Sequence, residues 1–181
     1  HRVDRRQRQM CIRDSTGVDI SKMNEPEIRE VCTNLGVEVD ESMGKGKLID
    51  EIFGEKCEGN YIQPTFITDY PVEMSPLCKK HRNNPELTER FELMVNGKEL
   101  ANAYSELNDP IDQKERFEDQ VKLAEKGDDE AMFIDLDFIR ALEYGMPPTS
   151  GMGIGIDRLV MFLCNQPSCL LYTSPSPRDR G

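Results

Sequence analysis

Three side chains in the central part of the chain have types and spacing that suit the binding of a small molecule. Asn102, Tyr104 and Glu106 stand at alternate positions, so on a β-strand they project from one face. An amide, an aromatic ring and a carboxylate suit a ligand with an ammonium group, an apolar stem and a carboxylate or carbonyl. The alternative interpretation of the same spacing is an ordinary exposed sheet face.

Two carboxylates lie a few residues upstream, on either side of a turn signal. Glu92 and Glu99 flank Asn96-Gly97, and a two-residue loop would make them diagonal neighbours on one face. Carboxylates that close repel each other unless a cation or a shared proton lies between them. Such oxygen ligands suit Mg²⁺ held jointly with phosphates. Two solvated acids are the alternative.

A glycine-rich stretch, TSGMGIGIDR, forms the third candidate. It lacks the G-x-G-x-x-G spacing of a dinucleotide-binding fingerprint, and no Gly-Lys-Ser/Thr follows as in a P-loop. Alternating glycines at Gly151, Gly153 and Gly155 would leave a strand backbone open to a flat ligand. Arg158, at the start of the helix that follows, would then point toward a phosphate or an adenine face.

The elements that must position these side chains can be predicted from local patterns. Phe91–Val95 and Lys98–Glu106 are strand patterns joined by Asn96-Gly97, a pair typical of a tight hairpin turn. Helices are expected over residues 24–36, 47–56, 109–127, 136–145 and 157–163, with extended structure over 61–74 and 151–156. This order contains no repeated βαβ unit. It predicts an α+β fold in which helices flank an antiparallel sheet.

A regular hairpin would separate the two candidate sites. It would place Glu92 and Glu99 on one face and Asn102, Tyr104 and Glu106 on the other. One extra residue in the second strand reverses the direction of every side chain that follows. If both sets serve one site, the sequence therefore predicts a β-bulge or an equivalent twist between Glu99 and Asn102, at Leu100-Ala101. The alternative is a turn longer than two residues with a different register.

Composition excludes several classes of protein. The 34 acidic and 23 basic residues give a net charge of -11, which argues against a protein that coats nucleic acid non-specifically. No apolar run approaches the roughly 20 residues of a membrane helix, and no secretory signal pattern opens the chain. Six cysteines without a C-x-x-C pair indicate reduced thiols in a cytoplasmic protein.

The two ends differ in charge from the region between them. Residues 1–15 carry a net charge of +3 and residues 169–181 carry +1, so the middle carries -15. Neither end shows a clear pattern of helix or strand. We expect residues 1–15 to be a non-native or disordered leader that makes few contacts, 169–181 to be a similar tail, and 16–168 to form the folded part.

The glycine stretch and the hairpin together resemble a known family. Gly151–Arg158 resembles the third signature motif of class II aminoacyl-tRNA synthetases, and TERFELMVNGKELANAYSELND (88–109) resembles the lysyl members of that class. Ser75-Pro76-Leu77 and His81-Arg82 fit the same group. Aspartyl and asparaginyl members would carry Gly-Gly-Ser-x-Arg-x-His where this chain has Ala101–Glu106.

The resemblance implies roles for individual residues. Glu92 and Glu99 match acids that hold Mg²⁺ on the ATP phosphates. Arg158 matches the catalytic arginine that clamps ATP, and Gly153 and Gly155 belong to the same ATP-binding motif.

Asn102, Tyr104 and Glu106 match positions of the lysine pocket, with Glu106 near the substrate amino groups. The implied substrates are lysine, ATP and tRNA(Lys), and the implied assembly is a cytoplasmic homodimer.

The resemblance covers about residues 16–168 and implies the C-terminal part of a class II catalytic domain. The first and second signature motifs and an anticodon-binding domain are not found in the chain, so we expect the 181 residues alone to be inactive. Two alternatives stay open: a lysyl-synthetase paralogue that lysylates a translation factor, and a non-catalytic acidic interaction module.

Overall fold

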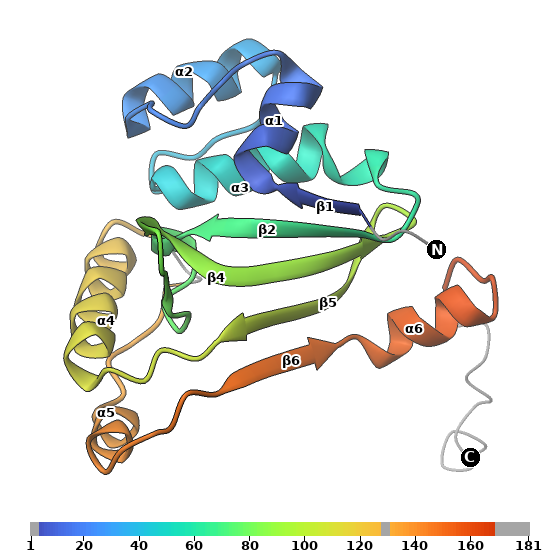
Figure 1. Cartoon of the computed structure of the whole chain (residues 1–181). Helices are drawn as coiled ribbons and strands as arrows, with labels where there is room; N and C mark the ends of the chain where they lie inside the picture. The colour runs from blue at the N-terminus through green and yellow to red at the C-terminus, as the bar shows by residue number, and fades with distance from the viewer. Residues whose placement is uncertain (1–3, 128–130, 169–181) are drawn as a thin grey trace, which may run out of the picture.

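The fold is built on one six-stranded sheet with helices on one face and at its ends (Figure 1). A computed structural model describes residues 4–127 and 131–168. The strand order is β1-β2-β4-β5-β6, and β3 pairs with β4 off this path. In chain order the elements are β1 (Asp4–Gln7), α1 (Arg8–Thr16), α2 (Glu25–Leu35), α3 (Lys45–Lys56), the 3-10 turn η1 (Glu58–Asn60), β2 (Thr65–Pro71), the 3-10 turn η2 (Val72–Met74), β3 (Lys80–His81), β4 (Asn84–Val95), β5 (Lys98–Ser105), α4 (Pro110–Glu125), α5 (Leu136–Glu143), β6 (Ser150–Ile154) and α6 (Ile156–Leu163).

The α+β class predicted from the sequence is confirmed, but the sheet is not purely antiparallel. β2, β4, β5 and β6 pair in antiparallel fashion, whereas β1 runs parallel to β2 with Asp4 opposite Thr65. Helices α1, α2 and α3 lie between these two strands in the chain, and a long helical crossover is the connection that parallel strands need.

Helix ends follow the local signals in the sequence. Asn24 and Glu27 form a reciprocal capping box at the start of α2, and Gly36 ends that helix at φ +67°. Asp109 accepts backbone hydrogen bonds at the start of α4, where Pro110 takes the first helical position. The expected helices are therefore all present, with boundaries shifted by a few residues.

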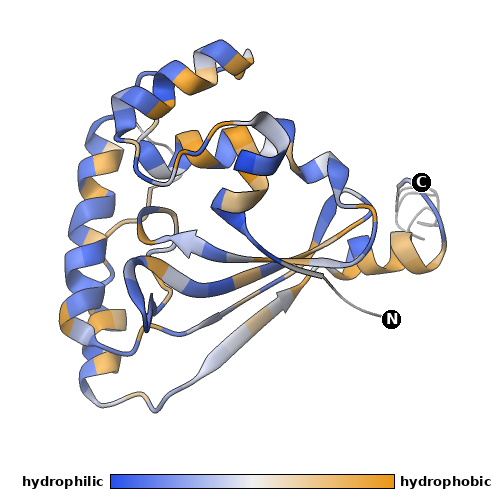
Figure 2. Ribbon diagram, turned by 45° about the horizontal axis from the view of Figure 1, so that its top comes forward, coloured by the Kyte–Doolittle hydropathy of each residue, from blue (hydrophilic) through white to orange (hydrophobic). Residues whose placement is uncertain are grey.

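The core lies between the sheet and helices α1 to α3 (Figures 1 and 2). Figure 2 shows orange, apolar segments on these helices where they approach the sheet. Three fully buried aliphatic side chains of α3, Leu48, Ile49 and Ile52, pack there against Ile67 of β2 and Met94 of β4. This packing holds α3 over the face of the sheet that carries the candidate site.

The N-terminal segment differs from the expectation of a leader with few contacts. Residues 4–15 form β1 and most of α1, and Cys11 and Ile12 are fully buried. Arg8 is also buried: it pairs with Asp50, and its guanidinium lies 4.1 Å from the centre of the Phe53 ring. The sequence pattern missed this segment because a buried arginine stacked on aromatic rings adds nothing to apolar periodicity. Residues 1–3 and the expected tail, 169–181, lie outside the described residues.

Three further details differ from the sequence-based expectation. β4 begins at Asn84 rather than Phe91, β3 was not expected, and residues 72–74 form a 3-10 turn instead of extended structure. In the part of the chain that the structure describes, no helix is long and apolar enough to cross a membrane.

The packing of α1 leads to a direct test of its place in the fold. Ile12→Ala should lower the free energy of unfolding of this chain by about 2–5 kcal/mol, because a fully buried aliphatic side chain is removed. Met10→Ala in the same helix is the control: Met10 is 50% exposed, and the change should stay within about 0.5 kcal/mol. Chemical denaturation measures both, and equal effects would contradict the packing of α1.

Candidate functional site

A β-bulge in the hairpin brings the two predicted sets of side chains to one face of the sheet. Met94 pairs with Glu99, but the preceding residue of β4, Leu93, pairs with Ala101, so Leu100 is the extra residue in β5. Glu92 then lies directly opposite Asn102. The predicted bulge at Leu100-Ala101 is therefore confirmed, and Glu92, Glu99 and Asn102 share one face.

The turn that starts this hairpin has the predicted geometry. Asn96 and Gly97 have φ values of +54° and +68°, the left-handed conformation that a two-residue hairpin loop needs at both positions. The loop also receives support from outside the hairpin, since the backbone N–H groups of Asn96 and Gly97 donate to the carbonyl oxygens of Ile62 and Tyr61. The register of β4 against β5 is fixed at this end.

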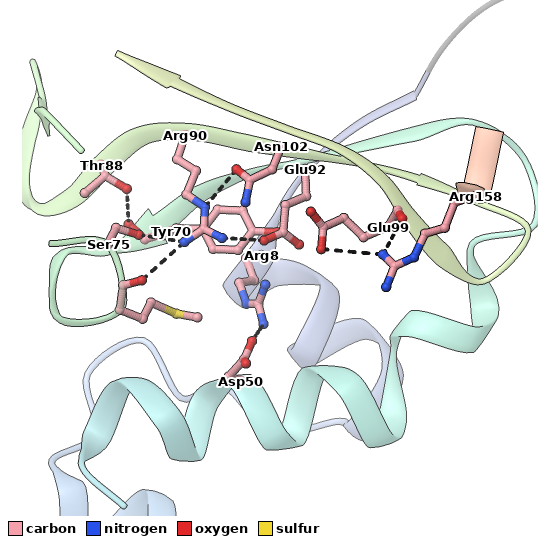
Figure 3. Close-up of polar contacts among 11 residues, drawn as sticks. Arg8, Asp50, Tyr70, Ser75, Thr88, Arg90, Glu92, Glu99, Asn102 and Arg158 are labelled. Atoms are coloured by element: carbon pink, nitrogen blue, oxygen red, sulfur yellow. Dashed lines mark hydrogen bonds and ion pairs between the residues drawn. The ribbon is translucent and has the colours of Figure 1, made fainter. Parts of the chain in front are cut away.

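A cavity of about 870 Å³ opens over the face that the bulge creates. Arg90, Glu92 and Glu99 line it from the sheet, and Asp50 and Glu58 line it from the side of α3 and η1. Figure 3 shows these sheet side chains directed toward α3. Asn102, Tyr104 and Glu106 do not line this cavity: Asn102 and Tyr104 lie farther along β5, and Glu106 follows the last residue of that strand.

Arg90 joins the two sets and was missed by the sequence analysis. One terminal nitrogen, Nη2, lies 2.6 Å from Glu92 Oε1, and Nε donates to Asn102 Oδ1 at 3.2 Å. Arg90 stands two residues before Glu92 on the same strand, so alternation alone places both side chains on one face. That spacing was the available signal.

Arg158 approaches the site from the start of α6. Its Nη1 donates to the carbonyl oxygen of Glu99 at 2.6 Å and lies 3.9 Å from Glu99 Oε2 (Figure 3). The backbone N–H of Gly155 donates to the carbonyl oxygen of Leu100 at 3.0 Å, which fixes the start of α6 beside the bulge. The glycine stretch and the acid-bearing hairpin thus meet at one place.

Burial and the repulsion between neighbouring carboxylates raise the pKa values of two acids of the site. Burial raises the pKa of Glu99, and Glu92 raises it further, while Arg158 and Arg90 oppose the shift. Burial and the charge of Glu92 also raise the pKa of Glu58, an acid from η1 that the sequence analysis did not single out. Carboxylates with raised pKa values beside one another favour a bound cation.

The glycines of β6 make room for the side chains of Asn102, Tyr104 and Glu106. Gly151 pairs with Tyr104 and Gly153 pairs with Asn102 across the β5–β6 ladder. A Cβ atom at Gly151 would lie 2.5 Å from Glu106 Oε1, so the absence of a side chain there gives the Glu106 carboxylate its place. Burial raises the pKa of Glu106, and both burial and Glu106 raise the pKa of Tyr104.

The donor set fits a magnesium ion shared with phosphates better than a cage made of protein alone. Within residues 4–127 and 131–168, no group of three or more acidic, histidine or cysteine side chains converges as metal ligands. Mg²⁺ commonly takes one or two carboxylates and completes its shell with water and substrate phosphates. Glu92 and Glu99 lie on one face, and the charge of Glu92 raises the pKa of Glu99, so this pair of carboxylates matches that requirement.

The sequence of the chain matches one family of enzymes. The family model for tRNA synthetases class II (D, K and N) matches residues 11–170, and the chain therefore belongs to this family.

Within the family, the chain is similar to proteins named lysine–tRNA ligase. It is 82% identical over 170 residues to the one from Porphyromonas gingivalis and 74% identical over 158 residues to the one from Christiangramia forsetii, which cover 92% and 87% of this chain. These stretches make up 29% and 28% of the two relatives, so the chain spans less than a third of their length. The resemblance to the lysyl members is confirmed.

The opposite pKa shifts of two glutamates predict opposite effects on stability. Because the pKa of Glu99 is raised in the folded chain, its charge destabilises the fold at pH values above 4.5, the usual pKa of a glutamate. At lower pH the side chain is protonated in both the folded and the unfolded chain, and this cost disappears. Glu99→Gln should raise the free energy of unfolding at pH 7 by less than about 1.4 kcal/mol, because the side chain is 37% exposed and its charge is screened. The gain should vanish below about pH 4.

Glu89→Gln is the matched comparison: Glu89 lies in β4, on the face of the sheet opposite to that of Glu99. Its bond to Arg82 lowers the pKa of Glu89 to about 2, so its charge stabilises the fold above pH 4.5 and the benefit is lost as pH falls toward 2. The amide should lower stability at pH 7. Denaturation curves at pH 7 and pH 4 measure both variants, and effects of the same sign would refute the electrostatic description.

Proposed function

We propose that this chain supplies the ATP-binding and lysine-binding part of an enzyme that joins lysine to tRNA(Lys). The observation that carries the proposal is the bulge at Leu100, which sets Glu92 and Glu99 on the same face as Asn102 and Tyr104. The similarity to lysine–tRNA ligases supports the choice of substrates.

The chemistry of such an enzyme has two steps. The carboxylate of lysine attacks the α-phosphate of ATP, and pyrophosphate leaves; the lysyl-adenylate then passes its lysine to the terminal ribose of the tRNA. The protein contributes by holding the reacting groups together and by neutralising charge that develops on the phosphates.

The lysine site lies along β5 beyond the cavity. Glu106 binds an ammonium group of the substrate through a charge-assisted hydrogen bond, and Tyr104 covers the apolar stem of the lysine. Asn102 binds the carboxylate end. The glycines opposite them on β6 support this arrangement, since they leave room above Tyr104 and Asn102.

The ATP site lies nearer the turn of the hairpin. Glu92 and Glu99 hold the magnesium that accompanies the ATP phosphates, and Arg158 clamps the nucleotide from the start of α6, beside Gly153 and Gly155. Magnesium supplies charge neutralisation to the phosphates when it is bound. The cytoplasmic location and the homodimer implied by the resemblance belong to the same proposal.

A graft tests the proposal on a full-length enzyme. Residues 16–168 of this chain replace the matching segment of the P. gingivalis lysine–tRNA ligase. The graft should catalyse lysine-dependent exchange of pyrophosphate into ATP and should charge tRNA(Lys). Exchange without charging of tRNA would favour the paralogue that modifies a protein, and a folded graft with neither activity would overturn the proposal.

Within this graft, Glu106→Gln should raise the KM for lysine about 10- to 150-fold and leave the KM for ATP nearly unchanged. The amide keeps the shape of the side chain but loses a charge-assisted hydrogen bond, worth about 1.5–3 kcal/mol. Glu86→Gln, at an exposed position of β4, is the control and should change neither constant. Equal losses for both substrates would contradict the assignment of Glu106 to lysine.

A further inference from the structure

Arg90 lies between the acid of the ATP site and the amide of the lysine site, and it contacts both. We propose that Arg90 is a positioning residue: it orients Asn102 so that the amide nitrogen faces the carboxylate of the amino acid, and it holds Glu92 in place beside it. This inference rests on the proposed function and adds a residue to which the resemblance assigned no role.

The guanidinium group makes one contact to each half of the site. Nη2 lies 2.6 Å from Glu92 Oε1, a short charge-assisted contact, and Nε donates to Asn102 Oδ1 at 3.2 Å. Glu92 and Asn102 are cross-strand partners in β4 and β5. One planar group therefore spans the ladder at the point where the two sites meet (Figure 3).

The guanidinium is itself fixed from the opposite side. Nη1 donates to the carbonyl oxygen of Met74 at 3.2 Å and to Ser75 Oγ at 3.1 Å. Its carbon lies 4.4 Å from the centre of the ring of Tyr70, a fully buried side chain. The Thr88 hydroxyl in turn donates to the carbonyl oxygen of Tyr70 at 3.0 Å. With only 15% of the Arg90 side chain exposed, these contacts leave the group one orientation.

The contact with Asn102 decides which end of the amide serves the ligand. A side-chain amide has one oxygen that accepts and one nitrogen that donates. Because Arg90 Nε donates to Oδ1, the oxygen is directed toward β4 and the nitrogen takes the other direction. Asn102 is therefore presented as a hydrogen-bond donor, which is what a substrate carboxylate requires.

The contact with Glu92 addresses a separate problem. The Glu92 side chain is only 12% exposed, and a carboxylate removed from water is costly unless an opposite charge compensates it. Arg90 supplies that charge through Nη2, which contacts Oε1 of Glu92 on the side away from Glu99 (Figure 3). A lysine at this position would keep the charge but lose the planar fork that reaches Glu92, Asn102 and Ser75 together.

The first experiment replaces the arginine in the graft. Arg90→Lys should raise the KM for lysine about tenfold or more and lower kcat of the exchange reaction, measured per folded, titrated active site. The control is Arg82→Lys, since Arg82 also pairs with a glutamate of β4, Glu89 at 2.7 Å, but is 77% exposed. It should leave both constants unchanged. If Arg90→Lys lowers the melting temperature but changes neither the KM for lysine nor kcat, the role of Arg90 is only structural and the proposal is overturned.

The second experiment leaves Arg90 intact and tests the orientation of the amide. Asn102→Asp keeps an oxygen acceptor for Arg90 but replaces the donor nitrogen by an oxygen that repels a carboxylate. The KM for lysine should rise at least tenfold, whereas the inhibition constant of lysinamide, which has no carboxylate and can only compete with lysine for the site, should change less. If the aspartate variant binds lysine as the parent does, Asn102 is not presented as a donor and the proposal is wrong.

A double variant shows whether Arg90 acts through Asn102. The effect of Arg90→Lys on the KM for lysine should largely disappear in an Asn102→Ala background, since the group it orients is then missing. Fully additive effects would contradict the coupling. The failure of the function itself is distinguished by the parent graft, because loss of lysine-dependent exchange before any of these changes would count against the proposed function and not against Arg90.

Discussion

One extra residue in a strand is the constraint on which the rest of the site depends. Side chains alternate between the two faces of a strand, so Leu100 reverses the direction of every side chain of β5 that follows it. Without it, Asn102 would face away from Glu92. The close turn at Asn96-Gly97 fixes the register from one end, and the bond from Gly155 to Leu100 fixes the bulge from the side. The glycine stretch therefore stabilises the hairpin, in addition to any contact that it makes with a ligand.

The same face concentrates charge at a cost to stability. Glu92 raises the pKa values of both Glu99 and Glu58, and burial acts in the same direction. Arg90 and Arg158 offset part of this repulsion from opposite sides. A structure that needed only to fold would gain nothing from acids placed so close together. Their proximity is the physical reason to regard this face as a place where a cation and phosphates bind.

Local sequence signals were sufficient to predict most helices and strands, because each of these signals depends on residues that are close together in the chain. The capping box of Asn24 and Glu27 and the cap at Asp109 depend on a few neighbouring residues. The parallel pairing of β1 with β2 depends instead on partners about 60 residues away. The burial of Arg8 likewise requires Asp50 and Phe53, which lie far along the chain. Neither could be inferred from residues 1–15 alone.

The sequence by itself determined the residue types of the site, their spacing and the family, because strand alternation and turn chemistry are local properties and the glycine stretch is distinctive. It also implied the bulge, since two sets of side chains with one purpose had to share a face. Only the tertiary structure decided that Arg90 joins the two sets and that Glu58 adds its charge to them. Those contacts depend on how β5, η1 and η2 meet β4, and such meetings are set by packing between segments distant in the chain.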